Sequence, residues 1–283
     1  MVLNFNLKGS ALRSLLLLVF LATALFGIEI VNGEVKIFHY PKDPPKTIGY
    51  NGEFTLPLIK HPQDRGYLAV LPINYRTTNS EATLTKLFDS GTKRYNITIK
   101  QGQYKQEQLR VDPSKVSPPK EQLPRIRQEY KEAMKIYNST TDSRYWEKPF
   151  IYPLNSVITS DYGNARVFNE SLQSFHSGTD FRAAIGTPIK ATNDGVVVLA
   201  QDRYYAGKSV VLDHGHGIYS VYFHLSQIDV SVGDKLSRGE VLGLSGDTGR
   251  VTGPHLHFGI MVQGYAINPL HFIDTINSYL KES

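Results

Sequence analysis

Short apolar segments separated by turn residues run from about residue 151 to the end of the 283-residue chain and point to a β fold. They follow one another at intervals of about 8 to 12 residues, mostly with glycine, asparagine or aspartate between them. The segments are TPIKAT, GVVVLAQ, SVVLDHG, SVYFHLS, EVLGLSG and HLHFGIMV. Strands this short and this regular predict a compact all-β domain over residues 151–283.

A second β-rich region and a helix precede this domain. Within residues 34–118, GYLAVLPINYR and RYNITIKQ combine β-branched and aromatic residues with local alternation, which predicts a small β-sandwich. Prolines in DPSKVSPPKEQLP then end the strand pattern. Residues 119–150 are expected to contain a linking helix and a linker, so the fold class is mainly β. The helix is indicated by apolar residues at helical spacing, namely Leu123, Ile126, Tyr130, Met134 and Tyr137.

Residues 1–33 are typical of a targeting segment. Lys8 and Arg13 precede an uncharged apolar run from Leu15 to Ile28, which suits a signal peptide and is shorter than the roughly 20 residues that span a bilayer. No cleavage site stands out, and an uncleaved run extended to Val31 would give a membrane anchor instead. Both interpretations predict that the chain is exported.

The chain has no cysteine, which excludes disulfides and thiolate metal ligands. Any metal must therefore be bound by histidine, aspartate or glutamate. The net charge of +5 is uneven, because residues 1–150 contain 22 Lys and Arg against 14 Asp and Glu, whereas residues 151–283 contain 9 against 12. A solvated basic surface explains the N-terminal excess better than an anionic cell-envelope partner does, and no nucleic-acid partner is expected.

Seven of the nine histidines fall in residues 151–283, which makes this domain the place to look for a site. His176 and Asp180 lie on either side of Gly178 and Thr179 in FHSGTDF. We therefore expect a strand interrupted by a turn, which can bring the imidazole and the carboxylate to one metal ion.

Strand alternation places three further histidines. In SVYFHLS, it puts His224 on a polar face together with Ser220 and Tyr222. In GPHLHFGIMV, it turns His255 and His257 to one side and the apolar residues between and after them toward the core.

Together these segments offer a ligand set for zinc. A catalytic zinc site takes three protein ligands and keeps one position open for water. His176, Asp180 and one histidine of the pair would supply the three ligands, and the two histidines left over would act as general base or acid. Spacing alone does not decide between His255 and His257.

The remaining motifs are weaker. GLSGDTGRVTGP lacks the ending of a phosphate-binding loop, and its first part, GLSGD, lacks the last glycine of a serine-nucleophile motif. We therefore interpret GLSGDTGRVTGP as a flexible loop that leads into His255. His214 and His216 stand where a strand gives way to a turn, and hydrogen bonds to the backbone are favoured there over metal binding. His39 and His61, in proline-containing loops, are expected to be ordinary surface residues.

Taken in order, HSGTD, YFHLS and TGRVTGPHLHF, with TPIKATNDGVVVLA and the closing NPLHF, resemble the LytM/lysostaphin-type zinc endopeptidases, which cut peptide cross-links of bacterial peptidoglycan. The resemblance covers residues 155–273 and implies a β-sandwich/barrel hybrid for the C-terminal domain. It implies zinc ligands at His176, Asp180 and His257, and catalytic histidines at His224 and His255.

The resemblance also implies a function, namely an exported zinc endopeptidase of the periplasm or cell envelope with a peptidoglycan peptide as substrate. A bond between D-alanine and diaminopimelate is favoured over a glycine bridge. Two alternatives stay open. One is a catalytically quiet peptidoglycan-binding module or activator of another hydrolase. The other is a peptidase whose N-terminal domain covers the groove until a regulatory partner or proteolysis releases it.

Overall fold

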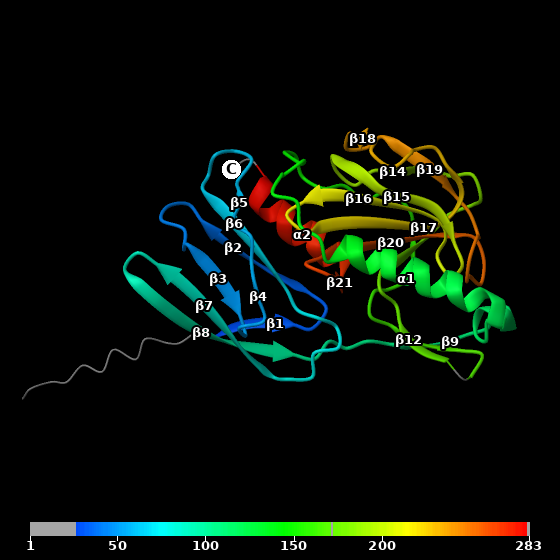
Figure 1. The fold of residues 1–283 in the computed structure, drawn as a ribbon, viewed down its shortest axis with the longest axis horizontal. Coiled ribbons are helices and arrows are strands. Elements are labelled where there is room, and N and C mark those ends of the chain that lie inside the picture. The colour runs from blue at the N-terminus through cyan, green and yellow to red at the C-terminus, as the bar shows by residue number, and fades with distance from the viewer. Residues whose placement is uncertain (1–26, 171, 282–283) are drawn as a thin grey trace, which may run out of the picture.

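The computed structural model describes residues 27–170 and 172–281, which form two β units and two α-helices (Figure 1). Most of the predicted signal peptide or anchor, residues 1–33, lies outside the described residues. Its end is described, because strand β1 (Ile28–Val31) pairs in parallel with β8 (Gly91–Lys100). The folded N-terminal unit therefore begins before residue 34. In the described ranges, no helix is long and apolar enough to cross a bilayer.

The N-terminal unit consists of two sheets that share a core. One has the strand order β1-β8-β7-β3-β4 and the other the order β2-β6-β5. Ala69 and Leu71 pack into the core between the sheets, whereas Leu68 and Val70 on the same strand pack into the core of the C-terminal unit. Because successive side chains of β6 point to opposite faces, this strand contributes to both cores and joins the two units. The remaining strands are β2 (Val35–Tyr40), β3 (Thr47–Tyr50), β4 (Phe54–Thr55), β5 (Ile59–Lys60), β6 (Tyr67–Pro72) and β7 (Glu81–Phe88).

The C-terminal unit is built on a ten-stranded sheet with the main path β10-β13-β20-β17-β16-β15-β18. All six segments predicted from the sequence contain strands of this sheet, and the mainly β fold class is confirmed. The strands are β10 (Ile158–Ser160), β13 (Thr179–Arg182), β14 (Pro188–Lys190), β15 (Gly195–Arg203), β16 (Gly207–Gly215), β17 (Ile218–Ile228), β18 (Lys235–Leu236), β19 (Val241–Ser245), β20 (His255–Val262) and β21 (Tyr265–Ile267).

A small third sheet, with the order β12-β11-β9, connects the two halves of the chain. β11 (Ala165–Phe168) pairs in parallel with β9 (Gln106–Leu109) and antiparallel with β12 (Leu172–Phe175). Residues 106–109, which the sequence places in the N-terminal domain, therefore pair with a hairpin of the C-terminal region. This connection matters because β9 and β11 lie beside the candidate site.

Both α-helices pack on the C-terminal unit. The predicted linking helix is present as α1 (Leu123–Tyr137), which begins with Pro124 in its first turn and packs Ala133 and Tyr137 against the sheet. The residues that it packs against belong to β15, β16 and β17, and Figure 1 shows α1 lying alongside the C-terminal unit. The last helix, α2 (Pro269–Leu280), is capped by Asn268 and buries its apolar face in the shared core. Two short 3₁₀-helices, Pro113–Lys115 and Lys120–Gln122, precede α1.

Candidate metal centre

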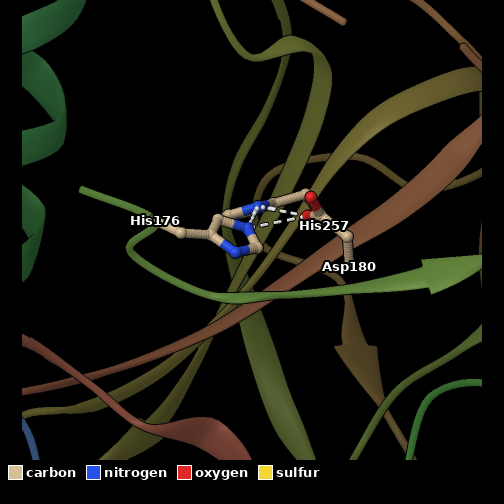
Figure 2. A group of neighbouring side chains, drawn as sticks. All are labelled: His176, Asp180 and His257. Carbon is tan, nitrogen blue, oxygen red and sulfur yellow. Dashed lines mark hydrogen bonds and ion pairs between the residues drawn. The ribbon is translucent and has the colours of Figure 1, made fainter. Parts of the chain in front are cut away.

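Two antiparallel strands and a turn bring three of the predicted site residues together. β13 pairs with β20 so that Asp180 lies opposite His257, and His176 stands in the turn between β12 and β13. Figure 2 shows the three side chains converging. His176 Nε2 lies 2.8 Å from Asp180 Oδ1 and 2.9 Å from His257 Nδ1, and His257 Nδ1 lies 2.9 Å from the same carboxylate oxygen. This turn between two strands is the local structure that the sequence predicts.

A shared metal ion explains the positions of these three atoms better than hydrogen bonds among them do. His176 Nδ1 lies 2.8 Å from the carbonyl oxygen of Asp161. This nitrogen therefore carries the ring proton of the neutral imidazole, and Nε2 directs a lone pair into the cluster. A proton on His257 Nδ1 could then satisfy only one of its two neighbours. All three residues are buried, so a cation that accepts all three lone pairs is the simplest partner. Two imidazoles and a carboxylate are a ligand set that zinc accepts.

The protonation states suit metal binding. Burial lowers the pKa of His257 to about 4. Burial alone would raise the pKa of Asp180, but its interactions with His176 and His257 hold it well below its usual value. Both groups are therefore deprotonated at neutral pH, which is the form that binds a metal.

The ring of His257 is held from two sides. A Cβ atom at Gly178 would lie 2.7 Å from His257 Nε2 and 2.4 Å from the carbonyl oxygen of Phe258, so only glycine leaves room there. Phe223 stacks on the ring, with a centroid distance of 5.2 Å and an interplanar angle of 5°. Packing against His257 and Phe258 thus explains why a glycine occupies position 178 in HSGTD.

His224 and His255 lie beside the three-atom cluster without joining it. Each donates Nδ1–H to a backbone carbonyl 2.8 Å away, that of Thr248 and that of Gly253 respectively. Their ring centroids are 4.9 Å apart, and His255 Nε2 lies 3.7 Å from Asp180 Oδ1. Both imidazoles therefore keep an Nε2 lone pair available next to the metal ligands.

His224 reaches the site through a β-bulge. Between Tyr222 and Leu225, β17 contains one residue more than the facing part of β16, and the φ of His224 is 65°, in the left-handed region. Tyr222 and Leu225 both face the core, whereas His224 contacts His255 on the other side of the sheet. The prediction that His224 shares a face with Ser220 and Tyr222 is therefore wrong. The extra residue, and not strict alternation, places this histidine.

The loop between β19 and β20 positions both of these histidines. Besides the carbonyls of Thr248 and Gly253, it contributes the Thr248 hydroxyl, which donates to the Leu225 carbonyl at 2.8 Å, and the Arg250 N–H, which donates to the Tyr205 carbonyl at 2.8 Å. The sequence interpretation as a flexible loop missed this role. The loop is bonded to β17 and to the β15–β16 turn on both sides of the site.

A charged network that the sequence did not reveal orients Asp180. Arg166 Nη2 lies 2.6 Å from Asp180 Oδ2, and Arg166 Nε lies 3.0 Å from Glu107 Oε2. Glu107 also accepts from Ser160 and Asn164, each at 2.7 Å. No local pattern could have found this network, because it depends on the parallel pairing of β9 with β11.

Two other histidines, His214 and His61, have structural roles. His214 is buried with Nδ1 2.7 Å from the Asp194 carbonyl and Nε2 2.8 Å from Ser220 Oγ, which agrees with the predicted backbone hydrogen bonding. His61 is only 1% exposed, and its Nε2 lies 3.0 Å from the Tyr279 carbonyl in α2. The prediction of a surface position is therefore wrong for His61, because α2 covers it.

We expect His214 to make the protein sensitive to acid. Burial lowers the pKa of His214 to about 4, below its usual value of 6.5, so the unfolded chain binds this proton more readily than the folded chain. Stability is therefore lost as the pH falls from 6.5 toward 4, by about 2 kcal/mol between pH 7 and pH 5. Urea unfolding at both pH values should show a smaller change for His214→Gln than for the wild type. Equal changes would contradict the assignment.

Comparisons with known proteins identify the family of the C-terminal domain. Residues 174–269 match peptidase family M23, so this part of the chain is an M23 (LytM-type) peptidase domain. In sequence, the chain is 52% identical over 122 residues to the peptidoglycan DD-endopeptidase ShyA of Vibrio cholerae. It is 39% identical over 95 residues to the DD-carboxypeptidase/endopeptidase Mpg of Neisseria meningitidis.

The likeness differs in extent between relatives. The match to ShyA covers 42% of this chain and 28% of ShyA, and the match to Mpg covers 34% and 22%. The chain thus spans less than a third of the length of these curated relatives. A crystal structure of a candidate M23 peptidase from Pseudomonas aeruginosa is similar over 86% of this chain and 94% of its own, with a TM-score of 0.67 and 29% identity. The architecture therefore recurs beyond the M23 domain.

Proposed function

We propose that this chain is an exported, zinc-dependent peptidoglycan endopeptidase that acts in the periplasm or cell envelope. The observation that carries the proposal is the convergence of His176, Asp180 and His257 beside two histidines that are held by backbone carbonyls. The DD-endopeptidase names of the Vibrio cholerae relatives support peptidoglycan as substrate and favour a bond between D-alanine and diaminopimelate. Export rests on the sequence of residues 1–33.

The two remaining histidines have the arrangement of a general acid–base pair. Zinc bound by the three ligands would supply Lewis acidity to the scissile carbonyl and to the attacking water. Burial and the neighbouring His255 and His257 lower the pKa of His224 well below its usual value, so His224 is neutral before reaction. The Nε2 atoms of His224 and His255 can then accept a proton from water, donate one to the leaving amine and stabilise the oxyanion.

The two alternatives have less support. All five residues expected for catalysis are present, which weighs against a catalytically quiet binding module or activator. The described residues of β1 to β8 line neither of the cavities beside the site, which weighs against occlusion by the N-terminal sandwich. The N-terminal region contributes only Glu107 and Leu109 of β9, and Val111 shortly after it, to the described lining of these cavities.

Digestion of purified cell-wall sacculi tests this function. The wild type with zinc should release muropeptides. Chelation should abolish release because it removes the metal, and His176→Ala should abolish it because one of the three protein ligands is lost. His39→Ala, which changes a histidine of the N-terminal unit, is the matched control and should retain activity. Mass spectrometry of the products identifies the bond that is cut. Cleavage by His176→Ala at the wild-type rate would contradict the proposal.

A further inference from the structure

A guanidinium lies beside the catalytic histidines without holding any metal ligand. Arg250 stands in the loop between β19 and β20, and the carbon at the centre of its guanidinium lies 4.3 Å from the centre of the Phe168 ring. The same carbon lies 4.7 Å from the centre of the Tyr205 ring. Contacts with two aromatic rings hold the cation in place and leave its N–H donors for another group.

Arg250 has no acceptor within the described residues. Its side chain forms no hydrogen bond or ion pair there, whereas the nearby Arg166 is paired with both Glu107 and Asp180. Burial lowers the pKa of Arg250, which means that its cation has lost part of its hydration. A half-buried and unpaired guanidinium gains most from a planar anion that accepts two parallel hydrogen bonds, and a carboxylate is such an anion.

The position of Arg250 is close to the place of reaction. Two cavities open beside the site, one reaching Asp180 and the other reaching His257. Arg250 and His224 line both of them. A peptide that places its scissile bond at the metal ligands and His224 would therefore have Arg250 within reach of its neighbouring groups.

We propose that Arg250 binds the free carboxylate on the carbon attached to the scissile nitrogen and so selects cross-links that carry this group. In a bond from D-alanine to diaminopimelate, the D-alanine carboxyl is itself part of the bond that is cut. The nearest free carboxylate therefore belongs to diaminopimelate, next to the leaving amine. An internal bond of a glycine bridge has no carboxylate at that place. This inference rests on the proposed function and specifies the substrate of the same site.

The test compares two cross-linked muropeptide dimers that differ only at this diaminopimelate carboxyl, free in one and amidated in the other. For the full chain with zinc, kcat/KM should be about tenfold to a hundredfold higher for the free acid. Arg250→Gln should bring the ratio close to one. Arg250→Lys should give an intermediate ratio, because lysine keeps the positive charge but lacks the two parallel N–H donors of the guanidinium. A wild-type ratio near one, or an unchanged ratio in Arg250→Gln, would overturn the proposal.

Controls separate this subsite from the folding of the protein and from the proposed function. Arg94→Gln removes an exposed arginine of β8, which lines neither cavity, and it should keep the wild-type ratio. If Arg250→Gln does not fold, Arg250→Lys takes its place in the test. A ratio below that of the wild type then supports the proposal, and an unchanged ratio overturns it. If the wild type cleaves neither dimer, the proposed function fails, and calorimetry with free and amidated diaminopimelate tripeptides still tests the subsite. Tighter binding of the free acid that is lost in the Arg250 variants supports it, and equal binding overturns it.

Discussion

His257→Ala should lose both zinc and activity, whereas His255→Ala should keep zinc and lose only rate. His257 Nδ1 lies 2.9 Å from each of the other two ligand atoms, so its removal leaves only two of the three protein ligands. His255 is bonded to the Gly253 carbonyl and stays outside the cluster, with Nε2 3.7 Å from Asp180 Oδ1. Loss of a general acid or base costs about 10²- to 10⁴-fold in rate. Metal analysis of the purified variants and their rates on sacculi measure the two effects.

The comparison is well matched, because the same substitution is made two residues apart on one strand and on one face of the sheet. His224→Ala should behave like His255→Ala, since its Nδ1 is also bonded to a backbone carbonyl. A zinc-containing His257→Ala or a zinc-free His255→Ala would reverse the assignment of the two histidines.

Local sequence patterns could predict the parts of the site that local structure determines. The alternation in HLHFGIMV places His255 and His257 on one face, and β20 does bury Leu256 and Phe258 on the other. The interruption that Gly178 predicts is present between β12 and β13, and within it His176 Nε2 lies 2.8 Å from Asp180 Oδ1. The separate roles of the two histidines came only from the resemblance to a family, because alternation treats them alike.

Features that depend on distant pairing could not be predicted in this way. The place of His224 depends on one extra residue in β17 relative to β16, and nothing within YFHLS indicates a bulge. Glu107 meets Arg166 only because β9 leaves the N-terminal region to pair with β11. His61 is buried because α2 returns from the far end of the chain to cover it.

The pair formed by Arg166 and Glu107 should matter for metal affinity although neither residue belongs to the ligand set. Arg166 binds Asp180 Oδ2 at 2.6 Å and so directs Oδ1 toward the two imidazoles. Loss of such a partner typically lowers metal affinity about tenfold to a hundredfold. The positive charge of Arg166 opposes this effect, because it repels a bound cation. Glu107, at 3.0 Å from Arg166, offsets that repulsion, so we expect the orienting effect to dominate.

A double variant separates orientation from charge. Glu107→Gln combined with Arg166→Gln leaves the net charge beside the site unchanged and removes only the charged hydrogen bonds. We expect its zinc affinity, measured by competition with a chromophoric chelator, to fall about tenfold to a hundredfold. Arg182→Gln, on the same strand as Asp180 but exposed, should bind zinc like the wild type. Wild-type affinity in the double variant would mean that the hydrogen bonds to His176 and the strand pairing of β13 with β20 hold Asp180 in place without the help of Arg166.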